Sequence, residues 1–184
     1  GLKPSSAFMA IGSAVILAGC GAVSHSPLPN PAQVNAFDVY TQPGELVRVE
    51  GNRRINVRCS GSGPVTVLLE AGLGYPSYSW RKVQPKIAAF TRVCSYDRAG
   101  LGFSDAGPMP RSASASADDI GRLVASGAIK PPFLLVGGSL GGQIVRLYAF
   151  RHPENVSGLV LVDPYVEGQY QAFARIEPTI AQEL

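Results

Sequence analysis

Short apolar runs alternate with segments of helical periodicity along most of this chain. The runs are four to eight residues long, which is typical of buried strands. Strands are expected at residues 46–50, 55–59, 65–70, 92–96, 133–136 and 156–162. Apolar side chains at helical spacing mark helices at 78–90 and 118–125, and Pro85 must break or restart the first of these.

This order of elements predicts an α/β fold with a mostly parallel sheet covered by helices on both faces. The turn Gly51-Asn52 joins the first two strands into an antiparallel hairpin at the start of the sheet. In such sheets the functional site lies at the carboxyl ends of the strands. Three loops are expected to meet there: residues 71–74, residues 97–102 and the segment after residue 136.

The N-terminal end carries an apolar segment of a different kind. Residues 7–18 are apolar and uncharged, Lys3 is the only charge before them, and the segment ends in Leu17-Ala18-Gly19-Cys20. This pattern is typical of a secretory signal and is shorter than the roughly 20 residues that span a bilayer. Leu-Ala-Gly-Cys resembles the bacterial lipobox, in which the signal is cut before the cysteine and the cysteine is lipidated. An ordinary signal peptide that happens to carry a cysteine is the alternative.

We therefore expect three parts. Residues 1–19 are a lipoprotein-type signal peptide, residues 20–44 are a tether rich in Pro, Asn and Gln, and residues 45–184 belong to one folded domain. The protein is then exported to the bacterial cell envelope and held at a membrane by lipid on Cys20, being otherwise periplasmic or secreted. Hydrophobic residues make up 46% of the chain and charged residues 16%, as expected of a globular protein. The formal charge is +3 without a basic cluster, so nothing supports nucleic-acid binding.

The most specific chemical signal is Ser139 within Gly137-Gly138-Ser139-Leu140-Gly141. An apolar strand precedes this G-x-S-x-G motif and a helical pattern follows it, which is the context of a nucleophile elbow. The turn is so tight that the serine adopts a strained backbone, and only glycine fits beside it. The backbone N–H of Leu140 opens the helix and is expected to stabilise an oxyanion. A Gly-rich loop without function is the alternative.

Four segments together resemble the α/β-hydrolase superfamily, in the order of that family: residues 67–74, 96–105, 137–141 and 159–164. The resemblance covers about residues 45–165 and implies a serine hydrolase. It also implies that this chain contains the family's fold only up to about the sixth strand. It gives the N–H of Leu73 a place in the oxyanion hole, with Ala71-Gly72 standing where the family has His-Gly. Gly138 replaces the usual histidine of the elbow, a form common in prolyl iminopeptidases. The turn with Asp97 and Arg98 is interpreted as structural, held by local hydrogen bonds.

The base and the acid of a catalytic triad are not evident. His152 lies 13 residues after Ser139, roughly 20 Å along a helix, and His25 lies in the expected tether. In the superfamily the catalytic histidine follows the eighth strand, so we expect it outside this chain and expect the chain alone to be inactive. Asp163 follows the sixth strand and is either the acid or a turn residue before Pro164. Residues 165–184 are a possible start of the cap that many members insert at this point.

The family's strand order also bears on the cysteines. It places Cys59, at the end of the second strand, beside Cys94 in the antiparallel fourth strand, and so implies a disulfide; two buried free thiols are the alternative. No spacing of His, Cys and carboxylates suggests a metal, and no phosphate-binding glycine loop suggests a cofactor.

The sequence therefore predicts a membrane-tethered serine hydrolase that cleaves a small-molecule carboxylic ester. An amidase similar to prolyl iminopeptidases is the alternative within the family. An inactive fragment or a tethered binding domain is the alternative of another class. The oligomeric state stays open.

Overall fold

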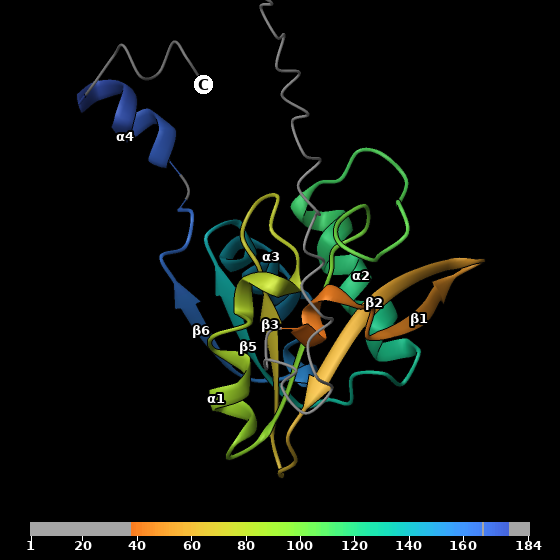
Figure 1. The fold of residues 1–184 in the computed structure, drawn as a ribbon. Helices are drawn as coiled ribbons and strands as arrows, with labels where there is room; N and C mark the ends of the chain where they lie inside the picture. The colour runs from red at the N-terminus through yellow and green to blue at the C-terminus, as the bar shows by residue number, and fades with distance from the viewer. Residues whose placement is uncertain (1–37, 167, 177–184) are drawn as a thin grey trace, which may run out of the picture. The chain divides into compact units, whose positions relative to one another are not determined.

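The computed structural model describes residues 38–166 and 168–176 (Figure 1). The strands are β1 (Glu45–Glu50), β2 (Arg53–Ser60), β3 (Thr66–Glu70), β4 (Arg92–Tyr96), β5 (Phe133–Gly138) and β6 (Val156–Val162). The α-helices are α1 (Gln84–Ala88), α2 (Ala113–Ala125), α3 (Leu140–Arg151) and α4 (Gln169–Ile176). Short 3₁₀ turns are η2 (Asp38–Thr41), η3 (Ser77–Trp80) and η4 (Pro153–Asn155). Cys20 and His25 lie outside the described residues.

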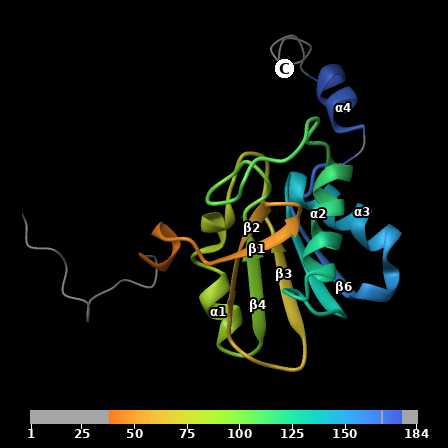
Figure 2. The same cartoon turned by 90° about the vertical axis from the view of Figure 1, so that its right-hand side faces the viewer.

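The strands form one six-stranded sheet in the order β1-β2-β4-β3-β5-β6. The β1–β2 and β2–β4 pairs are antiparallel, and β4–β3, β3–β5 and β5–β6 are parallel. Figure 2 shows η2 and α1 on one side of the sheet and α2 and α3 on the other. The predicted α/β fold class, with a mostly parallel sheet covered on both faces, is confirmed.

The core has two halves because successive strand residues face opposite sides of the sheet. In β3, Leu68 belongs to the larger cluster beneath α2 and α3, whereas Val67 and Leu69 face the smaller cluster under α1. All five residues of β3 are buried, which explains why Val67, Leu68 and Leu69 form an apolar run without alternation before the one charge, Glu70.

Some boundaries differ from the prediction, and each difference has a local cause. The helix expected at 118–125 begins at Ala113, because the Ser112 side chain accepts a hydrogen bond from the Ala115 N–H and caps the first turn. The helix expected at 78–90 is split into η3 and α1. Pro85 lies in the first turn of α1, where its missing N–H costs nothing, so it restarts the helix.

The expected tether, residues 20–44, also differs from the structure at its end. Residues 38–41 form the turn η2, and the side chain of Tyr40 is buried. The Tyr40 hydroxyl donates a hydrogen bond to Gln84 Oε1 at 3.0 Å, and its ring meets Tyr78 edge-on. An aromatic side chain with a partner for its hydroxyl gains enough from burial to bring this segment into the domain.

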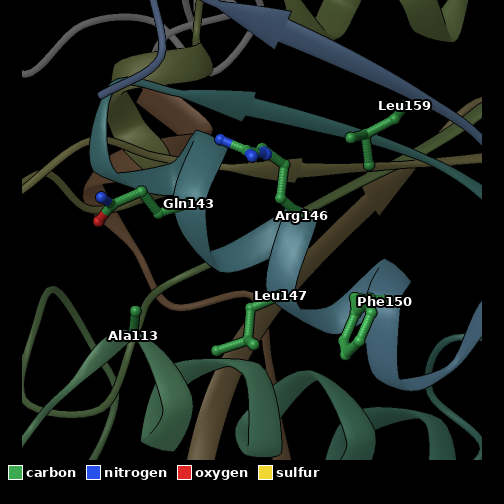
Figure 3. Close-up of a pocket in the computed structure, with 6 residues that line it drawn as sticks. All are labelled: Ala113, Gln143, Arg146, Leu147, Phe150 and Leu159. Carbon is green, nitrogen blue, oxygen red and sulfur yellow. The ribbon is translucent and has the colours of Figure 1, made fainter. Parts of the chain in front are cut away.

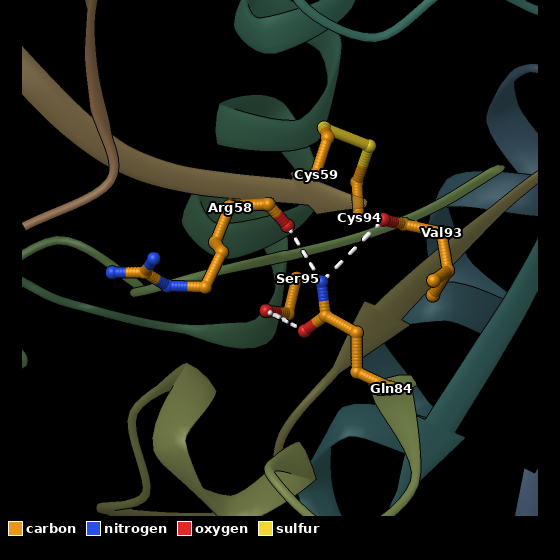
Figure 4. Close-up of a disulfide and its surroundings, with 6 residues drawn as sticks. All are labelled: Arg58, Cys59, Gln84, Val93, Cys94 and Ser95. Carbon is orange, nitrogen blue, oxygen red and sulfur yellow. Dashed lines mark hydrogen bonds between the residues drawn. A yellow bond between two sulfur atoms is a disulfide. The ribbon is translucent and has the colours of Figure 1, made fainter. Parts of the chain in front are cut away.

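A disulfide joins Cys59 of β2 to Cys94 of β4, as the family resemblance implied. The two residues are direct partners in the antiparallel register. Figure 4 shows the buried side chain of Gln84 beside this bridge. Its amide donates to the carbonyls of Arg58 and Val93 and accepts from the Ser95 hydroxyl, so α1 is fastened to both bridged strands.

Candidate active site

Ser139 stands at the junction between β5 and α3 in a strained backbone conformation. Its φ is 51° and its ψ is −119°, a region that non-glycine residues rarely occupy. The strain persists because α3 is pressed onto the sheet. A Cβ atom on Gly137 would lie 2.5 Å from the Gly141 carbonyl oxygen, and one on Gly141 would lie 2.5 Å from the Glu70 carbonyl oxygen. The glycines of the motif are therefore required by contact, as the sequence pattern predicted.

The turn is tied to the end of the neighbouring strand β6. The Ser139 N–H donates to the Val162 carbonyl at 3.0 Å, and the Tyr165 N–H donates to the Ser139 carbonyl at 3.2 Å. Between them lies Asp163, which is exposed and has a φ of 44°. Aspartate tolerates this left-handed conformation, which fits the turn role, and the same position keeps its carboxylate at the rim of the site.

A cavity of about 440 Å³ opens in front of Ser139. It lies at the carboxyl edge of the parallel strands, where ligands of α/β sheets bind. Its lining comes from four segments of the chain: Gly72, Leu73, Tyr75, Ser79, Trp80, Gly138, Ser139, Val162 and Asp163. The surface is mainly apolar with a few polar groups beside the serine, which is the usual character of a small-molecule site.

The two residues expected to supply oxyanion donors lie on either side of this serine. Leu140 is the first residue of α3, so its N–H has no acceptor within the helix. Leu73 lies in a tight turn that the Tyr75 N–H closes onto the Gly72 carbonyl, and a Cβ on Gly72 would be only 3.4 Å from Ser139 Cβ. Leu73 and Leu140 also line a second cavity of about 340 Å³, so Leu73 separates two hollows.

A buried network of charged side chains fixes the loop that carries Leu73. The sequence analysis did not predict this network. The Arg98 guanidinium pairs with the Glu70 carboxylate and donates hydrogen bonds to the carbonyls of Ala71 and Gly72. The Tyr96 hydroxyl donates to the other oxygen of Glu70. Both side chains of the ion pair are at least nine-tenths buried. A charge at the end of an otherwise apolar strand was the available signal, since a buried charge requires a partner.

Burial sets the protonation behaviour of this network. It raises the pKa of Glu70, and the neighbouring guanidinium of Arg98 opposes that rise. Burial, together with the Glu70 carboxylate, raises the pKa of Tyr96 well above its usual value. Tyr96 therefore stays a neutral donor at physiological pH.

Asp97, the residue before Arg98, organises the next loop. Its carboxylate accepts hydrogen bonds from the Ser77 N–H at 2.7 Å, from the Asn56 side chain at 2.8 Å and from the Phe103 N–H at 2.9 Å. A Cβ on Gly102 would collide with this carboxylate, so glycine is required there. The structural interpretation of the Asp97-Arg98 turn is confirmed, although its bonds reach β2, β3 and η3 and are not only local.

Comparison with known proteins agrees with this geometry. The sequence profile of a family described as "alpha/beta hydrolase fold" matches residues 65–178. The chain belongs to this family. An uncharacterized protein of Bacillus subtilis, YqjL, is 35% identical over 104 residues, which is 56% of this chain and 41% of that protein.

Solved structures of α/β-hydrolase relatives are similar to this chain over a large part of its length. A candidate lipase, lip1, from Acinetobacter baumannii AYE has a TM-score of 0.67 at 25% identity, over 81% of this chain and 50% of that one. A meta-cleavage product hydrolase from Pseudomonas fluorescens IP01 has a TM-score of 0.59 at 28% identity, over 66% of this chain and 45% of that one. This α/β-hydrolase chain thus spans 41–50% of the length of these three relatives.

The histidine within the described part of this α/β-hydrolase chain is not placed to serve Ser139. His152 ends α3, the helix that Ser139 begins. Its ring packs on Tyr148 with centroids 4.8 Å apart, and its Nδ1 lies 3.5 Å from the Glu154 carboxylate. The expectation that His152 lies at the far end of the helix from Ser139 is confirmed.

A larger cavity, of about 630 Å³, lies away from Ser139 on the outer side of α3. Figure 3 shows its lining: Gln143, Arg146, Leu147 and Phe150 from α3, Ala113 from α2 and Leu159 from β6. It contains no nucleophile and no acid–base pair, so size alone does not make it the site. Among the described residues, no group of three or more His, Cys, Asp or Glu side chains could hold a metal ion. No helix in the described ranges is long and apolar enough to cross a membrane.

Proposed function

We propose that this chain carries the nucleophile of a serine hydrolase that cleaves carboxylic esters through an acyl-enzyme. The observation that supports this most directly is the strained φ of Ser139 at the mouth of an apolar cavity, beside the first N–H of α3. Ser139 Oγ attacks the acyl carbonyl, the alcohol leaves with a proton, and water then releases the acid. The chain's relatives include a candidate lipase and a meta-cleavage product hydrolase. These names give the activities of those two proteins and not of this chain.

The N–H groups of Leu73 and Leu140 are proposed to hold the oxyanion. Neither donates a hydrogen bond to another of the described residues, so both are free to meet a developing negative charge. The hollows on the two sides of Leu73 offer separate room for the acyl part and the alcohol part of an ester. Fixed backbone donors of this kind contribute about 3 kcal/mol each to transition-state binding.

The proton shuttle is proposed to be a histidine outside this chain. It would take the proton from Ser139 Oγ and pass it to the leaving alcohol. Without that histidine a serine hydrolase keeps only the residual catalysis of its oxyanion donors and its binding site. We therefore expect this chain by itself to turn over esters very slowly and to hydrolyse its acyl-enzyme more slowly still.

The test is an assay with p-nitrophenyl butyrate in the presence and absence of imidazole, which replaces the missing base. We expect imidazole to accelerate p-nitrophenol release by the chain, and intact-mass analysis to show one butyryl group on Ser139. Ser139→Ala is the matched control, because imidazole also cleaves this ester in free solution. Equal rates for the two proteins and no acyl group on the parent would overturn the proposal and favour a non-catalytic binding domain. Prolyl p-nitroanilide, run beside the ester, distinguishes the amidase alternative.

We further propose that Cys20 is the lipid-bearing N-terminus of the mature protein, which places the domain at a membrane of the bacterial envelope. Two or more acyl chains give stable anchoring, since each buried methylene contributes about 0.8 kcal/mol. When the chain is expressed with an initiating methionine and labelled with a fatty-acid analogue, the parent should carry label and fractionate with membranes. Cys20→Ser should carry none and stay unprocessed. An unlabelled parent in the soluble fraction would mean an ordinary signal peptide.

A further inference from the structure

The segment from Ser77 to Arg92, which contains η3 and α1, has two different sides. Its inner side packs on the sheet through Trp80, Ile87 and Ala88 and is fastened by the buried Gln84. Its outer side carries two aromatic and three basic side chains: Tyr78, Arg81, Lys82, Lys86 and Phe90. We call these five residues the basic-aromatic face.

The aromatic residues of this face are exposed. Phe90 is 73% exposed and Tyr78 is 44% exposed, whereas Tyr40, Tyr96, Phe133 and Tyr148 are buried. The Arg81 guanidinium lies over the Tyr78 ring, 4.2 Å from its centroid, so the two side chains form one amphipathic surface.

The basic residues of this face have no carboxylate partner within residues 38–166 and 168–176. Six arginines elsewhere in the domain form ion pairs: Arg53, Arg54, Arg98, Arg111, Arg122 and Arg151. Among the described residues, by contrast, neither Arg81 nor Lys82 nor Lys86 pairs with an acid, and the sequence has no Asp or Glu between Glu70 and Asp97. No acidic side chain in the described part of the chain therefore neutralises the positive charge of this face.

The first described element, η2, lies beside this same face. Tyr40 of η2 contacts Tyr78 and Gln84, and the Arg58 guanidinium lies 5.1 Å from the Tyr40 ring centroid. Figure 2 shows η2 and α1 on one side of the sheet. The 18 residues from Cys20 to Asp38 span at most about 60 Å when fully extended. An anchor on Cys20 would keep the basic-aromatic face within that distance of the membrane.

We propose that the basic-aromatic face docks on an anionic lipid surface. Unpaired Lys and Arg side chains attract phosphate headgroups, and exposed aromatic rings insert at the level of those headgroups. Each basic residue near such a surface strengthens binding by about fivefold. The proposal rests on the proposed envelope anchor only for its setting in the cell, because the surface itself acts without lipid on Cys20. In the anchored protein it would orient the opening at Ser139 relative to the membrane.

The test measures binding of the chain from residue 20 onward, with Cys20→Ser, to vesicles of 40% phosphatidylglycerol in phosphatidylcholine. Arg81→Gln/Lys82→Gln/Lys86→Gln removes the charges of the face. Arg48→Gln/Lys130→Gln/Arg146→Gln removes three exposed charges elsewhere. The two triple variants therefore have the same net charge. We expect the first variant to bind at least tenfold more weakly and the second to bind within about threefold of the parent. Binding should also fall in high salt, because exposed charges are then screened.

If both triple variants lost vesicle binding equally, binding would depend on net charge alone, and the proposal would be overturned. Equal binding of the parent to pure phosphatidylcholine would do the same. Phe90→Ser provides a second measurement: it should weaken binding and leave the preference for phosphatidylglycerol unchanged. No substrate or attached lipid enters these measurements, so a failed esterase assay or an unlabelled Cys20 leaves their interpretation intact.

Discussion

Arg98 is the residue on which the geometry beside Ser139 most depends. It neutralises the buried Glu70 and binds the two carbonyls that precede Leu73, so one side chain fixes both a charge and a loop. Arginine suits this task because its planar fork directs several donors in fixed directions, which lysine cannot do. The loop of the proposed oxyanion donor is thus set by a residue that does not reach the cavity in front of Ser139.

We predict that Arg98→Ala lowers the free energy of unfolding by about 3–5 kcal/mol, since it leaves a buried carboxylate without its partner. Urea denaturation followed by circular dichroism measures this loss. Arg54→Ala is the matched control, because Arg54 also pairs with a carboxylate, that of Asp105, but both side chains are more than a third exposed. Its cost should be much smaller than that of Arg98→Ala, because an exposed ion pair contributes little to stability. Equal costs for the two variants would show that Arg98 does not hold the loop.

At this scale the sequence predicts the strained serine and not its support. Ser139 is recognisable because its neighbours in the chain are the glycines that its conformation requires. Glu70 and Arg98 are 28 residues apart, and no local pattern in the sequence predicts that their side chains form an ion pair. Only the adjacency of β3 and β4 brings them together.

The elements place the elbow through the close approach of α3 to the sheet. Gly141 lies in the first turn of α3, and its Cα faces the backbone of Glu70 and Ala71 at the end of β3. Any Cβ at this position would lie 2.5–2.9 Å from backbone atoms that cannot move aside. The helix would have to shift, and Ser139 would shift with it.

We therefore predict that Gly141→Ala destabilises the domain by about 1–3 kcal/mol, the usual cost of overpacking. Gly121→Ala is the matched control. Gly121 lies within α2, and its added methyl would have no neighbour closer than 4.0 Å. There alanine should stabilise the helix by up to about 1 kcal/mol. Thermal unfolding of the two variants provides the comparison, and a stabilised Gly141→Ala would contradict the close packing described for α3.

Most elements could be predicted from local pattern, and the exceptions have identifiable causes. The bounds of β4 and β6 agree with the prediction because their apolar runs begin and end sharply. The first turns of α2 were missed because alternating Ser and Ala show no apolar face, although Ser112 caps them. The burial of Tyr40 could not be predicted, since its partners Tyr78 and Gln84 are distant in the chain.

At the scale of the whole molecule, the two edges of the sheet differ in character. The β1 edge carries the charged residues Glu45, Arg48 and Glu50, which discourage pairing with another sheet. The β6 edge is apolar: Leu159, Val160, Leu161 and Val162 are each 37–48% exposed. Within the described residues β6 pairs only with β5. Phe150, on the neighbouring helix α3, is 84% exposed and enlarges this apolar surface.

We predict that this chain associates as its concentration rises, because an apolar edge strand is a template for further pairing. Size-exclusion chromatography with light scattering, over micromolar to millimolar concentrations, measures the effect. Val160→Lys places a charge on the β6 edge and should keep the chain monomeric where the parent associates. Val65→Lys is the matched control: Val65 is 41% exposed, precedes β3 and lies outside the edge, so its variant should associate like the parent. A parent that stays monomeric throughout, or a Val65→Lys that dissociates it equally well, would mean that the β6 edge does not drive association.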